Sequence, residues 1–298
     1  MAKIKIGLIQ YPLTKFKTQK EWEKSTLKWL AQAQKKNVEL LVFPEYGSME
    51  LVSLLPNFKK LNLNEQLHQL QDFYPHFFHF FLEAAQKFKM CIVAPSFPVF
   101  EKRKFINRAL VFSKNGQFSF QDKIKMTRFE DEIWGIQPGQ NQIKIFRSGP
   151  LRFGISICFD SEFPVFGALL AHAGCDLLLA PSCTETLWGH HRVHTGCRAR
   201  ALENQFYVAV SPIVKDSKWC EALDRNMGQA ALYGPSDKGF PADGEIAKGP
   251  LNRPALLVSE IDTEKIKKVR KEGGVFNFKH SSEMLTLKKH YSVQTVDF

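Results

Sequence analysis

Apolar residues are distributed along the chain in two alternating patterns. Short continuous apolar runs predict buried strands, because a strand covered on both faces is apolar at nearly every position. Longer runs with an apolar residue every three or four positions predict helices. Strands are predicted at 3–11, 38–43, 90–95, 109–114, 151–159, 176–180, 207–213, 229–233 and 255–261. Helices are predicted at 20–36, 64–89, 164–174, 191–205 and 263–272.

This alternation predicts an α/β fold in which helices cover a largely buried sheet. Asn115-Gly116 separates two strand-like runs and is typical of a tight hairpin, so the sheet should be mixed rather than wholly parallel. The chain shows no repeat of fixed period and no Gly/Ser/Pro-rich linker between unlike halves. We therefore expect one domain.

A cysteine ends one of the predicted buried strands. The segment Gly154-Ile-Ser-Ile-Cys158-Phe-Asp-Ser-Glu-Phe-Pro164 is typical of a strand that turns into a helix beginning near its proline. Such a turn exposes a side chain for attack, and nearby backbone N–H groups stabilise a thiolate or an oxyanion. A buried core cysteine is the alternative interpretation of this segment taken alone.

Two further segments carry candidate chemistry. Glu45 follows the strand-like run Leu40-Leu-Val-Phe-Pro at the strand end where α/β sheets bind ligands, and partial burial would suit it as a base. The segment from Phe120 to Gly139 mixes Lys, Glu and aromatic residues without a regular period, as site loops often do. An exposed loop glutamate and a solvated surface loop are the respective alternatives.

Taken together in chain order, Glu45, Lys123, Glu132 and Cys158 resemble the pattern of the nitrilase, or carbon–nitrogen hydrolase, superfamily. The resemblance covers residues 1 to about 275. It implies an α/β fold, a four-layer αββα sandwich with mixed sheets. It also implies a hydrolase domain over 1–275, a C-terminal tail over 276–298 at a subunit interface, no cofactor or metal, and a homodimer or larger homo-oligomer.

The resemblance also implies a role for each matching residue. Cys158 would be the nucleophile, Glu45 the general base, Lys123 the cation that stabilises the tetrahedral intermediate and Glu132 the second glutamate that positions the site. Phe159 would contribute its backbone N–H to the oxyanion hole. These residue types suit the reaction, because a carboxylate takes the thiol proton, the thiolate attacks an amide carbon and an ammonium group stabilises the oxyanion.

Contacts to the substrate are expected from Glu162, Glu185 and Trp188, which follow the nucleophile or the next predicted strand. If both glutamates face the pocket, they favour a cationic or amine-bearing amide. His190 and His194 have the spacing of a helical metal pair, but a third ligand and the glutamate of the H-E-x-x-H pattern are missing. We therefore expect no metal.

Composition narrows the remaining choices. The chain carries 41 Lys+Arg against 30 Asp+Glu, a net charge of +11, but the basic residues are dispersed in pairs and triplets, which does not indicate a nucleic-acid surface. Its 6 cysteines form no C-x-x-C pair and do not indicate a disulfide framework. No apolar run is long enough for a membrane span or a signal peptide, so we expect a cytoplasmic protein.

The expected function is cysteine-dependent hydrolysis of a small linear amide to an acid plus ammonia or an amine, through a thioester. N-carbamoyl compounds and nitriles are alternative substrates of the same machinery. A papain-like enzyme would instead need a histidine paired with Cys158. A catalytically silent scaffold or ligand-binding protein with the same pocket is the non-enzymatic alternative.

Overall fold

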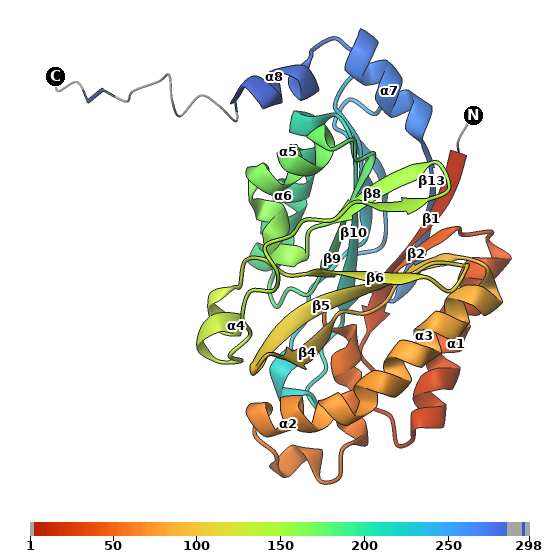
Figure 1. The fold of residues 1–298 in the computed structure, drawn as a ribbon, viewed down its shortest axis with the longest axis vertical. Helices are drawn as coiled ribbons and strands as arrows, with labels where there is room; N and C mark the ends of the chain where they lie inside the picture. The colour runs from red at the N-terminus through yellow and green to blue at the C-terminus, as the bar shows by residue number, and fades with distance from the viewer. Residues whose placement is uncertain (1–2, 285–293, 296–298) are drawn as a thin grey trace.

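The computed structural model describes residues 3–284 and 294–295. Its centre consists of two mixed sheets that meet at the first strand (Figure 1). β1 (Lys3–Pro12) belongs to the first sheet, and its last residues, Tyr11 and Pro12, pair in parallel with β10 (Tyr207–Val214) of the second sheet. This short pairing joins the two sheets into one continuous strand order.

The first sheet has the order β4-β5-β3-β2-β1, with β13 on β1 and β6 on β5. Its other strands are β2 (Leu40–Val42), β3 (Cys91–Val93), β4 (Phe97–Glu101), β5 (Lys104–Phe112), β6 (Phe118–Asp122) and β13 (Ala255–Asp262). The second sheet has the order β10-β9-β8-β7, with β11 on β10 and β12 on β11. Its other strands are β7 (Phe146–Ser148), β8 (Leu151–Ile155), β9 (Leu177–Ser182), β11 (Ala231–Tyr233) and β12 (Glu245–Lys248).

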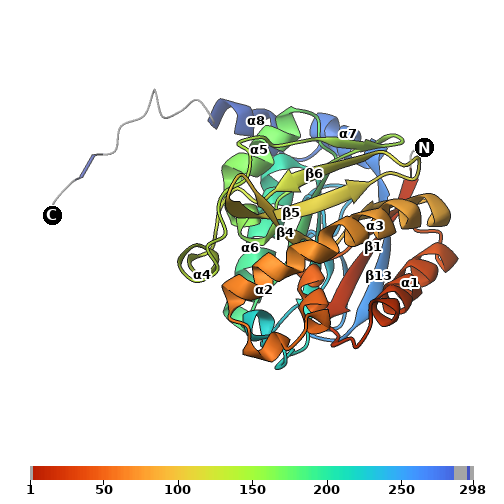
Figure 2. The ribbon, with the colours of Figure 1, turned by 60° about the horizontal axis from the view of Figure 1, so that its bottom comes forward.

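Helices cover the outer face of each sheet (Figures 1 and 2). α1 (Gln19–Lys35) and α3 (Tyr74–Phe88) pack on the first sheet, and α5 (Pro164–His172) and α6 (Leu187–Asn204) pack on the second. Alternate residues of β1 enter different apolar clusters. Ile6 and Leu8 join the second sheet and its helices, whereas Ile9 joins α1 and α3. This arrangement is the four-layer αββα sandwich that the resemblance implied.

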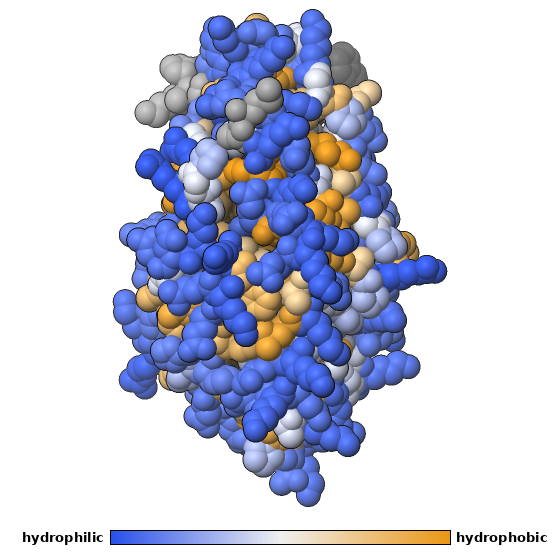
Figure 3. Space-filling model, turned by 90° about the vertical axis from the view of Figure 1, so that its right-hand side faces the viewer, coloured by the Kyte–Doolittle hydropathy of each residue, from blue (hydrophilic) through white to orange (hydrophobic). Residues whose placement is uncertain are grey.

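The described chain contains four further α-helices. They are α2 (Leu63–Leu70), α4 (Arg128–Glu132), α7 (Thr263–Glu272) and α8 (Asn277–Met284). β13 is half-buried over most of its length, and Figure 3 shows the molecule from this side, with apolar surface gathered between charged side chains. Among the helices described, none is long and apolar enough to cross a membrane.

Each predicted element is present, some with shifted boundaries, whereas several short elements were not predicted, among them β4, β7, β12 and α4. The helix predicted over 64–89 is divided into α2 and α3 by a 3₁₀ turn at Gln71–Phe73, since Pro75 begins a new helix and cannot continue the old one. The hairpin at Asn115-Gly116 is confirmed, with Gly116 at φ +82° between β5 and β6. The predicted tail over 276–298 begins with α8, and its remainder lies largely outside the described residues.

Candidate active site

Cys158 lies in a strained turn directly after β8. Its φ is +48°, a left-handed conformation that non-glycine residues rarely adopt, and its side chain is buried. The Ser161 hydroxyl donates to the Cys158 carbonyl at 2.6 Å and stabilises the turn. The sequence therefore places this thiol at a conformationally fixed point between a buried strand and α5, which begins at Pro164.

Asp160 connects the cysteine turn to the segment that carries Lys123. Its carboxylate accepts hydrogen bonds from the backbone N–H groups of Ile124, at 3.1 Å, and Lys125, at 2.7 Å. Burial raises the pKa of Asp160 to about 6, although Lys123 and these hydrogen bonds oppose the shift. The sequence prediction did not assign this residue, although its place two residues after the cysteine was a usable signal.

Lys123 follows β6 and is almost completely buried, at 1% exposure. Its ammonium group contacts Glu45 Oε1 at 2.8 Å and Glu130 Oε2 at 2.5 Å. Burial opposes the charged form, but the two carboxylates outweigh it and raise the Lys123 pKa well above its ordinary value. Lys123 is therefore a fixed cation between two acids.

The second glutamate of the site is Glu130, not the predicted Glu132. Glu132 ends the short helix α4 with its side chain 55% exposed, and it pairs with Arg128 at 2.7 Å. Thr127 caps α4 and forms a capping box with Glu130, which turns the Glu130 carboxylate inward toward Lys123. The motif Thr-x-x-Glu in the sequence was the signal that distinguishes these two positions.

Several further donors stabilise the Glu130 carboxylate. The Tyr46 hydroxyl donates to Oε1 at 2.7 Å, and the N–H and hydroxyl of Thr127 each donate to Oε2 at 2.9 Å. Burial would raise the pKa of Glu130, but Lys123 and these hydrogen bonds together lower it below its ordinary value. Glu130 is therefore ionised around neutral pH and fixes the orientation of Lys123.

Glu45 has the different environment expected of a base. Its Oε1 also accepts from Asn107 Nδ2 at 2.9 Å, and its Oε2 accepts at 2.9 Å from the N–H of Cys183, the residue whose carbonyl contacts the Cys158 sulfur. Burial raises the Glu45 pKa to about 7, with Lys123 opposing this shift. A carboxyl with this pKa exchanges protons readily near neutral pH.

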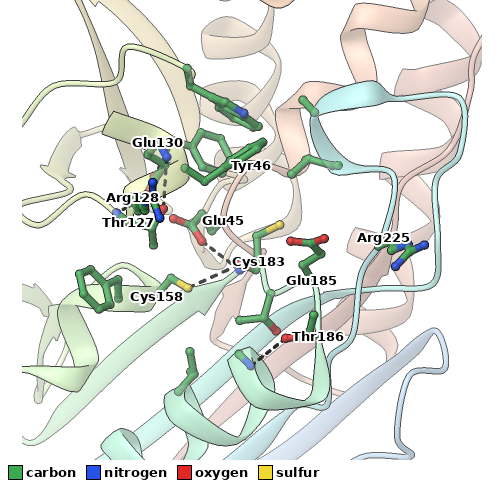
Figure 4. Close-up of a pocket in the computed structure, with 18 of the residues that line it drawn as sticks. Glu45, Tyr46, Thr127, Arg128, Glu130, Cys158, Cys183, Glu185, Thr186 and Arg225 are labelled. Atoms are coloured by element: carbon green, nitrogen blue, oxygen red, sulfur yellow. Dashed lines mark hydrogen bonds between the residues drawn. The ribbon is translucent and has the colours of Figure 1, made fainter. Parts of the chain in front are cut away.

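The Cys158 thiol is protonated in the resting site. Burial raises its pKa well above the ordinary value, and the neighbouring Glu45 adds to this shift. The sulfur lies 3.6 Å from the Cys183 carbonyl oxygen, and Figure 4 shows this contact beside the bond from Cys183 to Glu45. The thiol therefore needs a base to become a nucleophile, and Glu45, bound to the same Cys183 backbone, is the neighbouring carboxylate.

These groups open onto a cavity of about 500 Å³. Among the residues that the sequence analysis named, Phe159, Glu162 and Glu185 line it. Trp188 does not line it, and this residue is 79% exposed on a neighbouring shallow hollow. The cause is the start of α6, where Thr186 caps the helix by accepting from the Gly189 N–H at 3.2 Å (Figure 4) and the next two residues, Leu187 and Trp188, are exposed.

No histidine lines this cavity within the described part of the chain, so the papain-like alternative has no thiol–imidazole pair here. His194 of α6 instead contacts the Tyr233 hydroxyl of β11 at 2.5 Å, and burial lowers the pKa of His194 to about 3. Over residues 3–284 and 294–295, no group of three or more His, Cys, Asp or Glu side chains is arranged to hold a metal ion.

The fold and the chain's full-length similarity define its class. The family model "Carbon-nitrogen hydrolase" matches residues 5–271, and the chain belongs to this family, which lies in the nitrilase superfamily. The match assigns it to the hydrolases that act on carbon–nitrogen bonds.

The sequence identity between this chain and its individual relatives is low. The chain is 28% identical over 276 residues to "Probable hydrolase YhcX" of Bacillus subtilis, covering 93% of this chain and 53% of that protein. The chain thus spans about half the length of this relative. It is 22% identical to "Omega-amidase NIT2" of Bos taurus, covering 94% of this chain and 96% of that one. The crystal structure of a carbon–nitrogen hydrolase from Helicobacter pylori matches with a TM-score of 0.78 at 19% identity, covering 96% of this chain and 97% of that chain.

Proposed function

We propose that this protein hydrolyses the carbon–nitrogen bond of a small linear amide, with Cys158 as the nucleophile. The observation that carries the proposal is the meeting of three groups at one cavity. Lys123 lies 2.8 Å from Glu45, and the backbone of Cys183 contacts both Glu45, at 2.9 Å, and the Cys158 sulfur, at 3.6 Å. The similarity to an omega-amidase over nearly the whole of both chains supports an amide rather than a nitrile.

In the first half of the reaction, Glu45 takes the thiol proton and the thiolate attacks the amide carbon. The developing oxyanion lies against Lys123 and the backbone N–H of Phe159, while Glu130 keeps the ammonium group in place. The tetrahedral intermediate then expels ammonia or an amine, which receives its proton from Glu45. The acyl group remains on Cys158 as a thioester.

In the second half, the ionised Glu45 takes a proton from water, and the resulting hydroxide attacks the thioester carbon. The thiolate leaves, regains its proton from Glu45 and releases the carboxylic acid. One carboxyl therefore acts twice, which suits a group whose pKa of about 7 allows both proton uptake and release near neutral pH. N-carbamoyl substrates would follow the same steps.

Intact-protein mass spectrometry after brief exposure to a panel of small amides, N-carbamoyl compounds and nitriles tests this proposal. The expected result is an acyl adduct that peptide mapping places on Cys158 and not on the other thiols, together with release of ammonia. Cys158→Ala should lose the adduct and turnover. The matched variant Cys183→Ala should keep measurable turnover, because Cys183 contacts Glu45 and Cys158 through its backbone.

The absence of both adduct and ammonia across the panel would instead favour the silent scaffold. A Cys158→Ala protein with wild-type turnover would contradict the nucleophile directly. Turnover of nitriles with no turnover of amides would replace the amide assignment while leaving the cysteine chemistry in place.

We further propose that the chain forms a homodimer through α5 and α6. Large apolar side chains are exposed along these helices, although apolar side chains of this size are usually buried in a monomer. They are Val165, Leu169, Leu187, Trp188 and Leu202, each at least 42% exposed. A second copy of the same face would cover them and would extend the sandwich to αββα–αββα.

A further inference from the structure

The charges around the cavity differ in sign from those of the whole chain. The protein has a net charge of +11. Outside the catalytic groups, however, the cavity is lined by four acidic side chains and three arginines. The acidic ones are Glu162, Glu185, Glu221 and Asp224. Charges further away than a Debye length of about 10 Å are largely screened, so a cation at the cavity entrance responds mainly to the charges around it. An acidic entrance therefore attracts cations even though the whole protein is basic.

Ion pairs remove most of the positive charge from this entrance. Arg128 is bound by Glu132, with both bonds under 3 Å. Arg192 pairs with Glu162, although loosely, at 3.6 Å and with 63% of the arginine side chain exposed. Among the lining arginines of the described chain, only Arg225 has no ion pair.

Glu185 lines the same cavity as the catalytic groups. It lies two residues after Cys183, whose backbone contacts both Glu45 and Cys158. In Figure 4, Cys183 lies between Cys158 and Glu185. Two residues span at most about 7 Å, so the Glu185 Cα lies within about 7 Å of the Cα of Cys183, whose carbonyl oxygen is 3.6 Å from the Cys158 sulfur. Within residues 3–284 and 294–295, this carboxylate makes no ion pair.

The segment that carries Glu185 is held in a defined position. Thr184 donates from its hydroxyl to the Met227 carbonyl at 2.6 Å and accepts from the Met227 N–H at 2.8 Å. On the other side, Thr186 caps α6. Glu185 therefore projects from a short segment fixed at both neighbours, which limits the conformational entropy lost when a ligand binds.

From this geometry we propose that the substrate carries a cationic amine at the end remote from the scissile amide, and that Glu185 binds this amine. This inference rests on the proposed amidase function and names its substrate class, an ω-amino amide with a short aliphatic chain. Glu162 is the weaker candidate, because Arg192 already neutralises it. A charge-assisted hydrogen bond to Glu185 would distinguish this substrate from neutral and anionic amides of equal length.

Three amides with the same five-carbon chain test the proposal. They are 5-aminopentanamide, which is cationic, pentanamide, which is neutral, and glutaramate, which is anionic. Ammonia release gives kcat/KM for each. We expect 5-aminopentanamide to exceed pentanamide by about tenfold and glutaramate to be the poorest, with the preference declining as ionic strength increases.

Variants then assign the preference to one residue. Glu185→Gln should reduce the kcat/KM ratio of 5-aminopentanamide to pentanamide about tenfold. Glu83→Gln, an exposed glutamate on α3 outside the cavity, is the matched control and should leave the ratio unchanged. An unchanged ratio in Glu185→Gln, or a ratio lost only in Glu162→Gln, would overturn the assignment to Glu185.

Binding to the Cys158→Ala protein separates this inference from the proposed function, because it does not require turnover. Calorimetric dissociation constants for the three amides should show the same order, with the cationic amide binding most tightly. Equal affinities, or tightest binding of glutaramate, would overturn the cationic substrate class. Wild-type protein that binds the cationic amide selectively but releases no ammonia would contradict the amidase function alone.

Discussion

Glu45 and Cys158 have raised pKa values for the same reason, the burial of an acid whose ionised form loses its hydration. Their consequences differ. The thiol becomes harder to ionise, whereas Glu45, with a pKa of about 7, becomes a stronger base that is still partly ionised at neutral pH. The neighbouring Glu130 shows the opposite shift, because Lys123 and several donors outweigh its burial. The three acidic groups of the site, Glu45, Cys158 and Glu130, therefore differ in protonation state at neutral pH because their contacts differ.

The Glu45 pKa predicts the pH dependence of catalysis. Because the base must be ionised and its folded-state pKa is about 7, kcat/KM should fall about tenfold per unit as the pH is lowered below about 7. The measurement is a pH profile of kcat/KM on a primary amide, with circular dichroism at each pH to confirm that the protein stays folded. A flat profile from about pH 5 to 8 would show that Glu45 is not the base.

Glu130 and Glu132 form a natural matched pair, since they are two residues apart in the same short helix. Glu130→Gln should lower kcat at least about 100-fold, because Lys123 loses the charged partner that orients it. Glu132→Gln should stay within about threefold, since it removes only an exposed pair with Arg128. Equal losses in the two variants, measured by steady-state kinetics, would refute this distinction.

The sequence predicted the residues of this site unevenly, for a physical reason. Glu45, Lys123 and Cys158 each lie within three residues of the end of a strand, so local pattern and resemblance indicated them. Asn107, in contrast, lies inside β5 and meets Glu45 only because β3 pairs with both β5 and β2, the strand before Glu45. Tyr46 reaches Glu130 across 84 positions of sequence. Contacts of this kind depend on the tertiary arrangement and leave no local periodicity.

At the scale of elements, the cysteine turn is positioned by its close approach to α6. Gly196 of α6 faces the turn, and a Cβ there would lie 3.0 Å from the Ser161 carbonyl oxygen and 3.2 Å from the Glu162 Cα. Arg200, one turn later, donates to the same Ser161 carbonyl at 3.2 Å. The helix therefore contacts backbone, which cannot rotate away as a side chain can.

Gly196→Ala should displace the cysteine turn and lower kcat about tenfold or more, because small displacements of reacting groups are costly in rate. Alanine favours a helix by about 1 kcal/mol over glycine, so a loss of activity could not be attributed to a weakened α6. Steady-state kinetics and thermal unfolding measure the two effects. The exposed neighbour Thr195→Ala is the control, and wild-type kcat in Gly196→Ala would contradict this role of the close contact.

The length of an element determined whether the sequence could predict it. The long helices and buried strands have many residues of consistent period, and their presence was confirmed. α4 has 5 residues and β12 has 4, too few for a period to be recognised, and both were missed. The short helix α4 matters most for function, because its capping box selects Glu130 over Glu132. Local pattern therefore predicted the long helices and strands that carry the site better than it predicted the short segments that complete the site.

At the scale of the whole molecule, two faces expose apolar residues, and each of them would give a dimer with a different interface. The α5–α6 face carries Leu169 at 47% exposure and Trp188 at 79%. The face in Figure 3 carries the half-buried strand β13, and the loop before β13 exposes Leu251 at 48%. Both leucines are similarly exposed, so the same substitution can be compared at the two places.

We expect the native mass in analytical ultracentrifugation to be twice the 34.2 kDa of the chain, or a larger even multiple. Leu169→Glu should halve the mass of the dimer, because a second copy of α5 would then place two buried, unpaired carboxylates opposite one another. Leu251→Glu should leave the mass unchanged. A mass lowered by Leu251→Glu and not by Leu169→Glu would place the interface on the face of β13, and a wild-type monomer would exclude both. The same variant tests whether catalysis depends on the dimer. Because α5 directly follows the cysteine turn, loss of the dimer should also reduce kcat. A Leu169→Glu monomer with full activity would show that the catalytic groups need only one chain.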